Sequence, residues 1–347
     1  MISSRFGDKG TLEAKQRGRV RGSNRAFFAS SKKTNSRHDH KVKPITIRLG
    51  GYQKPASIHT RACERFGEVL KAKLGDQVDF QFVSDVLALG RKSGDLPIMV
   101  KNGELSMCYI SSLRFTEWVP ALKIFDLPFL MRDRATVYAA LDGALGDRLR
   151  AQLLEHSPYR LLGYWDNGFR HFSNRVRPIH TPADCKDIRI RHQMSTLQGE
   201  SLRLMGFEPI AEDIKIFFEQ IAGERFQAQD NPLTNIVNFN VHKHHRYITL
   251  SGHVFGVACL MVNRAEYDTW PAEVQQAVDI AAAEATVLQR QLAAAEDEEM
   301  LKKLDPAENE VVRLTADEHR AFVEAVKPVT DKYRKELGEE WFGLLMD

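Results

Sequence analysis

Two arginines flank a proline-rich loop in residues 165–191, and their positions suit the binding of an anion. Arg170 follows Asn-Gly-Phe, a turn signal, and leads into a strand-like run. Arg191 ends the run 187–191, in which isoleucines alternate with arginines, so Arg189 and Arg191 share one face of a predicted strand. Each guanidinium is either a solvated charge at a strand edge or a group held to bind a carboxylate through two parallel hydrogen bonds.

An asparagine further along the chain offers a second type of contact. Asn231 precedes Pro232, at the predicted carboxyl end of a strand that leads into a helix begun by proline. Its amide can hydrogen-bond a carboxylate oxygen or a ligand hydroxyl. An asparagine before a proline also favours a turn or a helix N-cap, so both interpretations stay open.

The elements that must position these side chains begin at residue 44. The first predicted elements are a strand at 45–49, a helix at 56–74, a strand at 78–83, a helix at 95–102 and a strand at 105–110. This βαβαβ order predicts a parallel sheet with right-handed connections. Ligands of such sheets bind beyond the carboxyl ends of the strands. The candidate loop residues there are Gly51, Tyr52, Ser57, His59, Ser111 and Ser112, each of which is either a ligand contact or an ordinary loop residue.

The rest of the chain continues the alternation of helices and strands. Helices are predicted at 135–141, 145–156, 195–205 and 216–222, and strands at 160–165, 207–210, 224–232, 247–250, 257–262 and 309–314. A helix-rich run from residue 271 to about 304 would reach roughly 50 Å if it were continuous. Residues 315–345 are predicted to be helical, with Trp341 and Phe342 docking that end. Trp165, just before Arg170, either walls a pocket or fills the core.

Several short motifs together resemble the solute-binding subunits of TRAP transporters, the DctP-like family. They are Gly-Phe-Arg at 168–170, Arg-Pro-Ile at 177–179, Thr-Pro-Ala-Asp at 181–184, Ile-Arg-Ile-Arg at 188–191 and Gln-Asp-Asn-Pro at 229–232. The resemblance covers roughly residues 45–345. Around the last motif this chain differs from the family, with Gln227 in place of aspartate, Ala228 of glycine and Asp230 of glutamate.

The resemblance implies an α/β, two-lobe, periplasmic-binding-protein-like fold with a hinge and a long helix that spans both lobes. The expected divisions are a disordered basic segment at 1–43, the first lobe at 44–160, the second lobe at 161–252, and return strands with C-terminal helices at 253–347. It also implies that Arg191 forms the bidentate salt bridge to a ligand carboxylate and that Arg170 and Asn231 reach the ligand. The further ligand candidates are Trp165, Ser111, Ser57 and His253.

Composition narrows the other classes of function. Residues 1–44 carry 12 Lys and Arg against three acids, a net charge of +9, so the remainder carries 37 − 43 = −6 and is not predicted to bind nucleic acid. The four cysteines have no C-x-x-C spacing, and no G-x-G-x-x-G or P-loop motif occurs, so neither a metal, a nucleotide nor another cofactor is expected. The histidines 242, 244 and 245 are predicted to form a solvated basic loop. The sequence contains no catalytic nucleophile motif of the kind that would indicate an enzyme, so an enzyme is not predicted.

The predicted function is therefore capture of a small organic acid by cleft closure and its delivery to membrane permease subunits. The resemblance implies a periplasmic location. Only residues 26–29 approach the apolar core of a secretory signal. Either the start site is misassigned or export does not occur, and the alternative function is a cytoplasmic carboxylate sensor or regulatory subunit of the same fold.

Overall fold

The computed structural model describes residues 43–345, so the predicted disordered segment 1–43 lies outside it except for its last residue. The strands are β1 (Ile45–Gly50), β2 (Val78–Val83), β3 (Met107–Ser111), β4 (Tyr159–Asn174), β5 (Arg189–His192), β6 (Glu208–Ala211), β7 (Ala228–Pro232), β8 (Tyr247–Asn263) and β9 (Glu310–Val312). The α-helices are α1 (Ile58–Leu74), α2 (Leu96–Lys101), α3 (Arg134–Asp142), α4 (Ala144–His156), α5 (Thr196–Leu204), α6 (Ile214–Glu219), α7 (Leu233–Asn238), α8 (Arg264–Thr269), α9 (Ala272–Leu301), α10 (Ala316–Leu337) and α11 (Glu339–Gly343).

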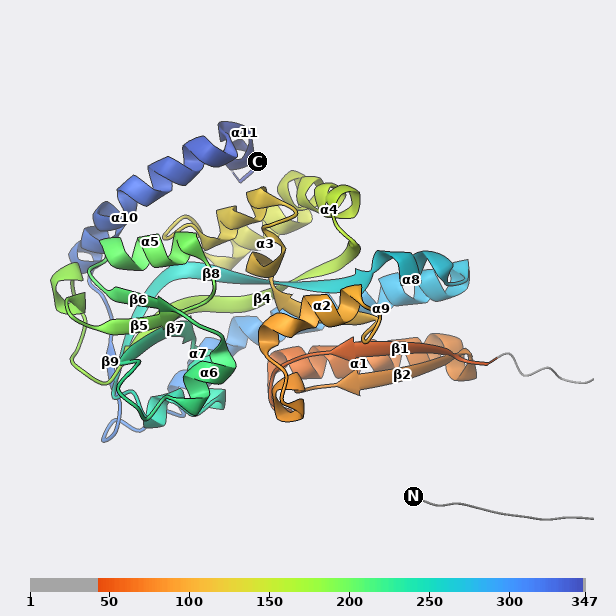
Figure 1. Ribbon diagram of the computed structural model, residues 1–347, viewed down its shortest axis with the longest axis horizontal. Coiled ribbons are helices and arrows are strands. Elements are labelled where there is room, and N and C mark those ends of the chain that lie inside the picture. The colour runs from red at the N-terminus through yellow and green to blue at the C-terminus, as the bar shows by residue number, and fades with distance from the viewer. Residues whose placement is uncertain (1–42, 346–347) are drawn as a thin grey trace, which may run out of the picture. The chain divides into compact units, whose positions relative to one another are not determined.

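The strands of this part of the chain join in one mixed sheet, in the order β2-β1-β3-β8-β4-β7-β5-β6, with β9 beside β8 (Figure 1). β1 pairs in parallel with both β2 and β3, which confirms the predicted βαβαβ unit. Ile47 and Leu49 of β1 are fully buried, and α1 packs Ala62 and Phe66 into the same core. The alternating strand β1 and the amphipathic helix α1 therefore pack on each other as the sequence pattern predicted.

The two long strands β4 and β8 depart from the prediction. Shorter strands at 160–165, 247–250 and 257–262 were expected, but each long strand is continuous over 16 and 17 residues respectively. The Asn-Gly pair before Phe169 is a β-bulge within β4 rather than a turn, because Gly168 adopts φ 82° and shifts the register against β8. The two strands pair antiparallel along their length, and they connect the two lobes.

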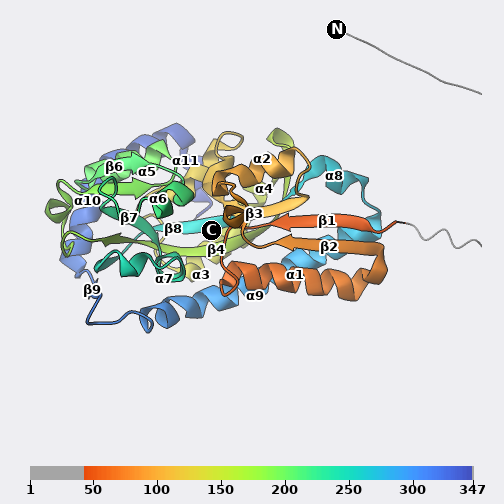
Figure 2. The ribbon, with the colours of Figure 1, turned by 60° about the horizontal axis from the view of Figure 1, so that its bottom comes forward.

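The long helix α9 confirms the predicted spanning element. It is continuous over 30 residues, about 45 Å. Near its middle Glu284 pairs with Arg65 of α1 in the first lobe at 2.7 Å, and further on Glu296 accepts a hydrogen bond from Thr234 of α7 in the second lobe at 2.9 Å. Figure 2 shows α9 passing from α1 towards α7. The two-lobe α/β fold is thus confirmed, whereas the lobe boundaries at 160/161 and 252/253 stay predictions.

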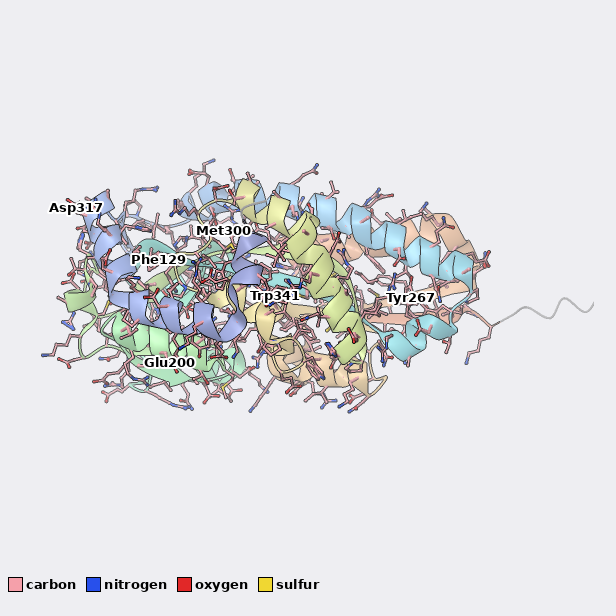
Figure 3. The ribbon with its side chains drawn as sticks, turned by 90° about the horizontal axis from the view of Figure 1, so that it is seen from above. Phe129, Glu200, Tyr267, Met300, Asp317 and Trp341 are labelled. Carbon is pink, nitrogen blue, oxygen red and sulfur yellow. The ribbon has the colours of Figure 1, made fainter. Side chains whose placement is uncertain are left out.

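The C-terminal helices pack on other helices of the chain, and Trp341 and Phe342 dock that end as predicted. Lys332 of α10 pairs with Glu200 of α5 at 2.8 Å, and the buried Trp341 of α11 lies under the Arg148 guanidinium of α4 at 4.3 Å (Figure 3). Phe342 is also buried. Within residues 43–345, no helix is long and apolar enough to cross a membrane.

The prediction of a solvated histidine loop is wrong for His245. Its side chain is fully buried, and Nδ1 lies 3.0 Å from the Ser173 hydroxyl. Burial lowers the pKa of His245 to about 3, so the ring is neutral at physiological pH. Of the histidines 242, 244 and 245, only His244 is exposed. The short helical turn that precedes His244 directs the next residue, His245, inward against Phe217. The four cysteines are buried free thiols.

Candidate ligand-binding site

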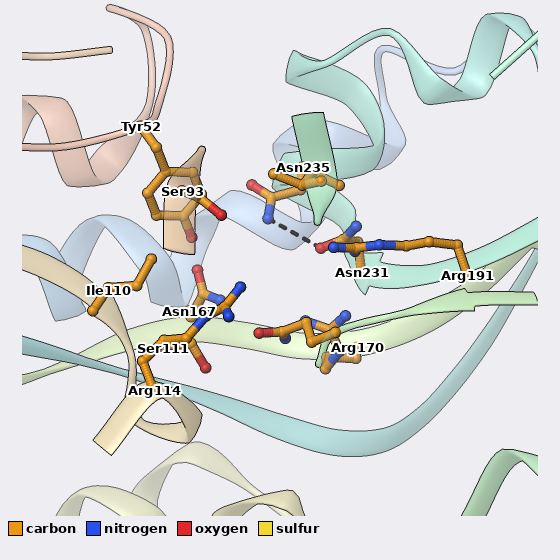
Figure 4. Close-up of a pocket in the computed structure, with 12 residues that line it drawn as sticks. Tyr52, Ser93, Ile110, Ser111, Arg114, Asn167, Arg170, Arg191, Asn231 and Asn235 are labelled. Carbon is orange, nitrogen blue, oxygen red and sulfur yellow. Dashed lines mark hydrogen bonds between the residues drawn. The ribbon is translucent and has the colours of Figure 1, made fainter. Parts of the chain in front are cut away.

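A polar cavity lies between the two lobes, at the carboxyl ends of β1, β3, β5 and β7 (Figure 4). The first lobe contributes Tyr52, Ser93, Ile110, Ser111 and Arg114, and the second lobe contributes Asn167, Arg170, Arg191, Gln193, Ile214, Asn231 and Asn235. The location agrees with the rule that α/β sheets bind ligands beyond the carboxyl ends of their strands. The cavity has a volume of about 30 Å³, room for about two water molecules.

Arg191 presents a guanidinium with free donors at this cavity. It lies on β5, is 2% exposed, and its Nε donates to the carbonyl of Glu212 at 2.8 Å. In the part of the chain described, its two terminal nitrogens have no hydrogen-bond acceptor. Burial, reinforced by the nearby Arg170, lowers the pKa of Arg191 to about 10, so the group remains charged at neutral pH. A rigid strand thus holds two parallel donors ready for an anion.

Arg189 shows that the shared strand face does not imply a shared role. Its Nη2 donates to the carbonyl of Glu224 at 2.6 Å and its Nε to that of Arg225 at 3.3 Å. These carbonyls belong to the loop before β7, at the end of β5 away from the cavity. The two arginines therefore have different roles. Arg189 anchors a loop, whereas Arg191 faces the cavity, as the anion-binding interpretation requires.

Arg170 is held in a buried ion pair. Its Nε lies 2.5 Å from Oδ2 of Asp230, and Nη2 donates to the carbonyl of the same residue. The Arg170 charge holds the pKa of the Asp230 carboxyl well below its usual range, against the opposing effect of burial. Because the pair fixes the guanidinium in place, the remaining face of Arg170 can meet a ligand at a small entropic cost.

His253 supports this pair instead of lining the cavity. Its Nε2 lies 3.3 Å from Asp230 Oδ2, and its Nδ1 lies 2.8 Å from the hydroxyl of Ser251. Burial lowers the pKa of His253, so the ring is neutral. A neutral ring facing a carboxylate must donate from Nε2, and the Ser251 hydroxyl then donates to Nδ1. The ring also stacks on Phe172 at 4.4 Å.

Asn231 belongs to a ladder of amides that crosses the cleft. Its Nδ2 donates to Gln229 and its Oδ1 accepts from Asn235 Nδ2 at 3.2 Å (Figure 4). Asn235 in turn accepts at Oδ1 from Gln53 Nε2 of the first lobe at 3.0 Å. The ladder orients Asn231 towards the cavity and ties the lobes together. The other interpretation, in which Asn231 caps the helix, is wrong, because Pro232 is the N-cap of α7 and no side chain of the described range caps that helix.

A second set of contacts closes the cleft around Asp213. Its Oδ2 accepts from the Ser93 hydroxyl at 3.0 Å and from the backbone N–H of Gly94 at 3.3 Å, and it lies 3.7 Å from Arg114 Nη2. The three donors belong to the first lobe and Asp213 belongs to the second. Its Oδ1 accepts from the Lys215 N–H as the N-cap of α6, which fixes the carboxylate at the cleft.

The structure brings together four of the seven candidates, Arg191, Arg170, Asn231 and Ser111. Ser57 is the buried N-cap of α1, where its hydroxyl accepts from the Thr60 N–H at 3.1 Å. Trp165 is fully buried, and its Nε1 donates to the Thr286 hydroxyl at 3.0 Å. Sequence reasoning missed Ser93, Ile110, Arg114, Asn167, Gln193, Ile214 and Asn235 as cavity residues.

Substitution of Trp165 by phenylalanine tests whether Trp165 belongs to the core and not to the binding site. The change removes the hydrogen bond to Thr286 and some core volume, so we expect the free energy of unfolding to fall by about 1–3 kcal/mol. Ligand affinity should stay within about twofold, because the indole does not line the cavity. Denaturant unfolding and calorimetric titration measure the two effects. A large loss of affinity in the folded variant would place Trp165 in the binding site after all.

Comparison with known proteins gives the same picture for most of the chain. The family model described as bacterial extracellular solute-binding protein, family 7, named DctP, matches residues 49–336. The chain is 27% identical over 293 residues to the 2,3-diketo-L-gulonate-binding periplasmic protein YiaO of Escherichia coli, covering 84% of this chain and 88% of that protein. It is 24% identical to the C4-dicarboxylate-binding periplasmic protein DctP of Rhodobacter capsulatus, covering 86% and 89%.

Solved structures share the fold. A TRAP periplasmic solute-binding protein from Sulfurospirillum deleyianum with bound succinate superposes with a TM-score of 0.83 at 23% identity, covering 88% of this chain and 99% of that one. The sugar acid binding protein DctPAm from Advenella mimigardefordensis, in complex with galactonate, has the same TM-score and identity, covering 88% and 97%. The motif resemblance is thereby confirmed, and the chain belongs to the DctP family of bacterial extracellular solute-binding proteins.

Proposed function

We propose that this solute-binding protein captures a small organic acid in the cavity between its lobes and delivers it to the permease subunits of a TRAP transporter. The observation that carries the proposal is Arg191, a buried guanidinium on a rigid strand whose terminal donors face a cavity lined from both lobes. A carboxylate matches these two donors in charge and in geometry. Arg170, Asn231 and Ser111 would supply further contacts.

Capture requires the cleft to open. A cavity of about 30 Å³ is too small for an organic acid, so the lobes must separate or the lining side chains must move before one enters. Separation breaks the contacts of Asp213 with Ser93 and Gly94, and that of Gln53 with Asn235. A ligand that bridges Arg191 of the second lobe and Ser111 of the first favours the closed state over the open one.

Family membership supports the permease partner and a location outside the cytoplasm. The relatives from Escherichia coli and Rhodobacter capsulatus are both named as periplasmic proteins, which supports periplasmic placement of this chain as well. The alternative of a cytoplasmic sensor has no supporting feature in residues 43–345. Recovery of the protein from fractionated cells, in the periplasmic fraction, is the expected outcome.

A thermal-shift screen of the full chain against small organic acids tests the capture of an acid. The protein is first unfolded, dialysed and refolded, so that any acid carried through purification is lost. An acid present at about 100 times its dissociation constant should stabilise the folded state by about 2.7 kcal/mol. The uncharged amide of the same acid is the matched control and should stabilise far less. If no acid stabilises the refolded protein, the proposed function is wrong.

A further inference from the structure

The charges around the cavity point to the class of acid. Three guanidiniums line it, those of Arg114, Arg170 and Arg191. Arg170 is compensated by Asp230 at 2.5 Å, and the side chains of both are at most 3% exposed. Arg114 faces Asp213 at 3.7 Å, with side chains 18% and 8% exposed. Two of the three positive charges are therefore balanced by carboxylates of the protein itself.

Arg191 is the guanidinium that the protein leaves uncompensated. Within the described range 43–345, its side chain hydrogen-bonds a neutral carbonyl alone, that of Glu212, whose own carboxylate pairs with Arg225 at 2.8 Å. His192 beside it adds no charge at neutral pH, because burial lowers the pKa of that ring. The arginines and their two carboxylate partners thus sum to one positive charge, which a single carboxylate neutralises.

One further carboxyl group, that of Asp126, lies near the arginines. It is buried near Arg170, outside the cavity lining, and accepts from Gln198 Nε2 at 2.9 Å. Burial raises the pKa of Asp126 to about 6, and any charge on it lowers the net positive charge near the cavity below one, so none is left for a second carboxylate. A second carboxylate on the ligand would therefore be an excess negative charge in a site removed from water, which is costly.

The rest of the cavity is lined with neutral polar groups. They are the side chains of Tyr52, Ser93, Ser111, Asn167, Gln193, Asn231 and Asn235, drawn from both lobes (Figure 4). Asn167 is 4% exposed, and its Oδ1 is a buried acceptor with no donor among residues 43–345. A carboxylate cannot donate a hydrogen bond to this oxygen, whereas a hydroxyl can. Hydroxyls also match the mixed donors and acceptors of the other side chains.

We infer that the site selects a monocarboxylate that bears several hydroxyls, a sugar-acid type of ligand, over a dicarboxylate. Arg191 takes the carboxylate, and the neutral lining, with Asn167 among it, takes the hydroxyls. The inference rests on the proposed function and adds the ligand class to it. A ligand without hydroxyls would leave the polar lining unpaired, which sites of this kind reject strongly.

Calorimetric titration of the full, refolded chain with matched acids tests this selectivity. The six-carbon pair is D-gluconate and D-glucarate, which differ by one carboxylate, and the four-carbon pair is D-erythronate and tartrate. Succinate serves as a dicarboxylate without hydroxyls. We expect at least one monocarboxylate to bind at least about tenfold more tightly than its dicarboxylate partner, as expected for one excess charge at an effective dielectric constant near 20.

The outcomes separate this inference from the proposed function. If glucarate, tartrate or succinate binds as tightly as the monocarboxylates, or if neither monocarboxylate binds while another acid from the screen does, the inference is overturned and organic-acid capture stands. If no acid binds at all, the proposed function itself fails. Tight binding of a hydroxylated monocarboxylate with weak binding of its partner supports both.

A charge-changing variant tests the cause of the selectivity. Asp213→Asn removes the compensation of Arg114 and keeps an N-cap for α6, because asparagine caps helices as well as aspartate. The ratio of the dicarboxylate to the monocarboxylate affinity should rise by about tenfold. The control is Asp85→Asn, since Asp85 also caps a helical turn and pairs with Lys54 at 3.0 Å but contacts no arginine of the cavity. An equal shift in both variants, or none in Asp213→Asn, would contradict the charge argument.

Discussion

Replacement of Arg191 by alanine is expected to weaken the binding of the acid by at least about 30-fold while the protein stays folded. Truncation of one partner of a buried, hydrogen-bonded charge pair costs about 2–5 kcal/mol in binding. Among residues 43–345 the Arg191 side chain makes one hydrogen bond, that to the Glu212 carbonyl, so its removal leaves a single acceptor unpaired there. Removal of a buried positive charge from beside Arg170 offsets part of that loss. Calorimetric titration of both proteins with the same acid measures the change.

Arg189→Ala is the matched control for this experiment. It removes the same side chain from the same face of β5, two residues earlier, where the guanidinium holds the loop carbonyls of Glu224 and Arg225. Affinity should remain within about twofold in this variant, because the site is distant from the cavity. Arg191→Lys should fall between the two, since lysine retains the charge without the two parallel donors. Equal affinity in Arg191→Ala and wild type would exclude Arg191 as the carboxylate ligand.

Local patterns predicted most of the elements because they determine local structure. The strand β1 and the helix α1 have the alternation and the apolar stripe that such elements require, and Gly75 marks the end of the helix. Ser57, predicted as a ligand contact, is instead the N-cap of α1. The failures involve glycines. Gly168 and Gly252 have φ of 82° and 55° inside long strands, where they permit bulges and bends. A glycine in a turn and a glycine in a bulge look alike in a sequence. The prediction therefore shortened β4 to residues 160–165 and divided β8 into two strands, at 247–250 and 257–262.

The candidate site was predictable only where a motif or a strand end marked it. Arg191 and Asn231 lie at the ends of strands that the pattern showed, whereas Arg114 lies in a short 3-10 helix after β3 and Asp213 is the N-cap of α6, far apart in the chain. Their meeting at 3.7 Å depends on the closure of one lobe on the other, which no local pattern encodes. Proximity in sequence also misled, because Trp165 belongs to the core although it lies five residues before Arg170.

The buried pair of Arg170 and Asp230 carries the largest expected effect on stability. Asp230→Asn leaves the Arg170 charge buried, 2% exposed, without its counterion, and the loss of one partner of a buried ion pair costs about 3–5 kcal/mol. His253 also loses the carboxylate that its Nε2 faces at 3.3 Å. Denaturant unfolding at pH 7 measures the change. Asp331→Asn, which breaks the exposed pair with Lys327, is the control and should cost less than about 1 kcal/mol.

The pH dependence of this difference identifies its cause. Arg170 holds the pKa of Asp230 well below the unfolded value of about 3.9, so between the two values the unfolded chain binds more protons than the native protein. Stability due to the pair is therefore complete above about pH 5 and is lost as the pH falls through the native pKa. Below about pH 3.9 the gap between wild type and Asp230→Asn should narrow by about 1.4 kcal/mol per pH unit. A gap that stays constant down to pH 3 would mean that lost packing, rather than the unpaired charge, destabilises the variant.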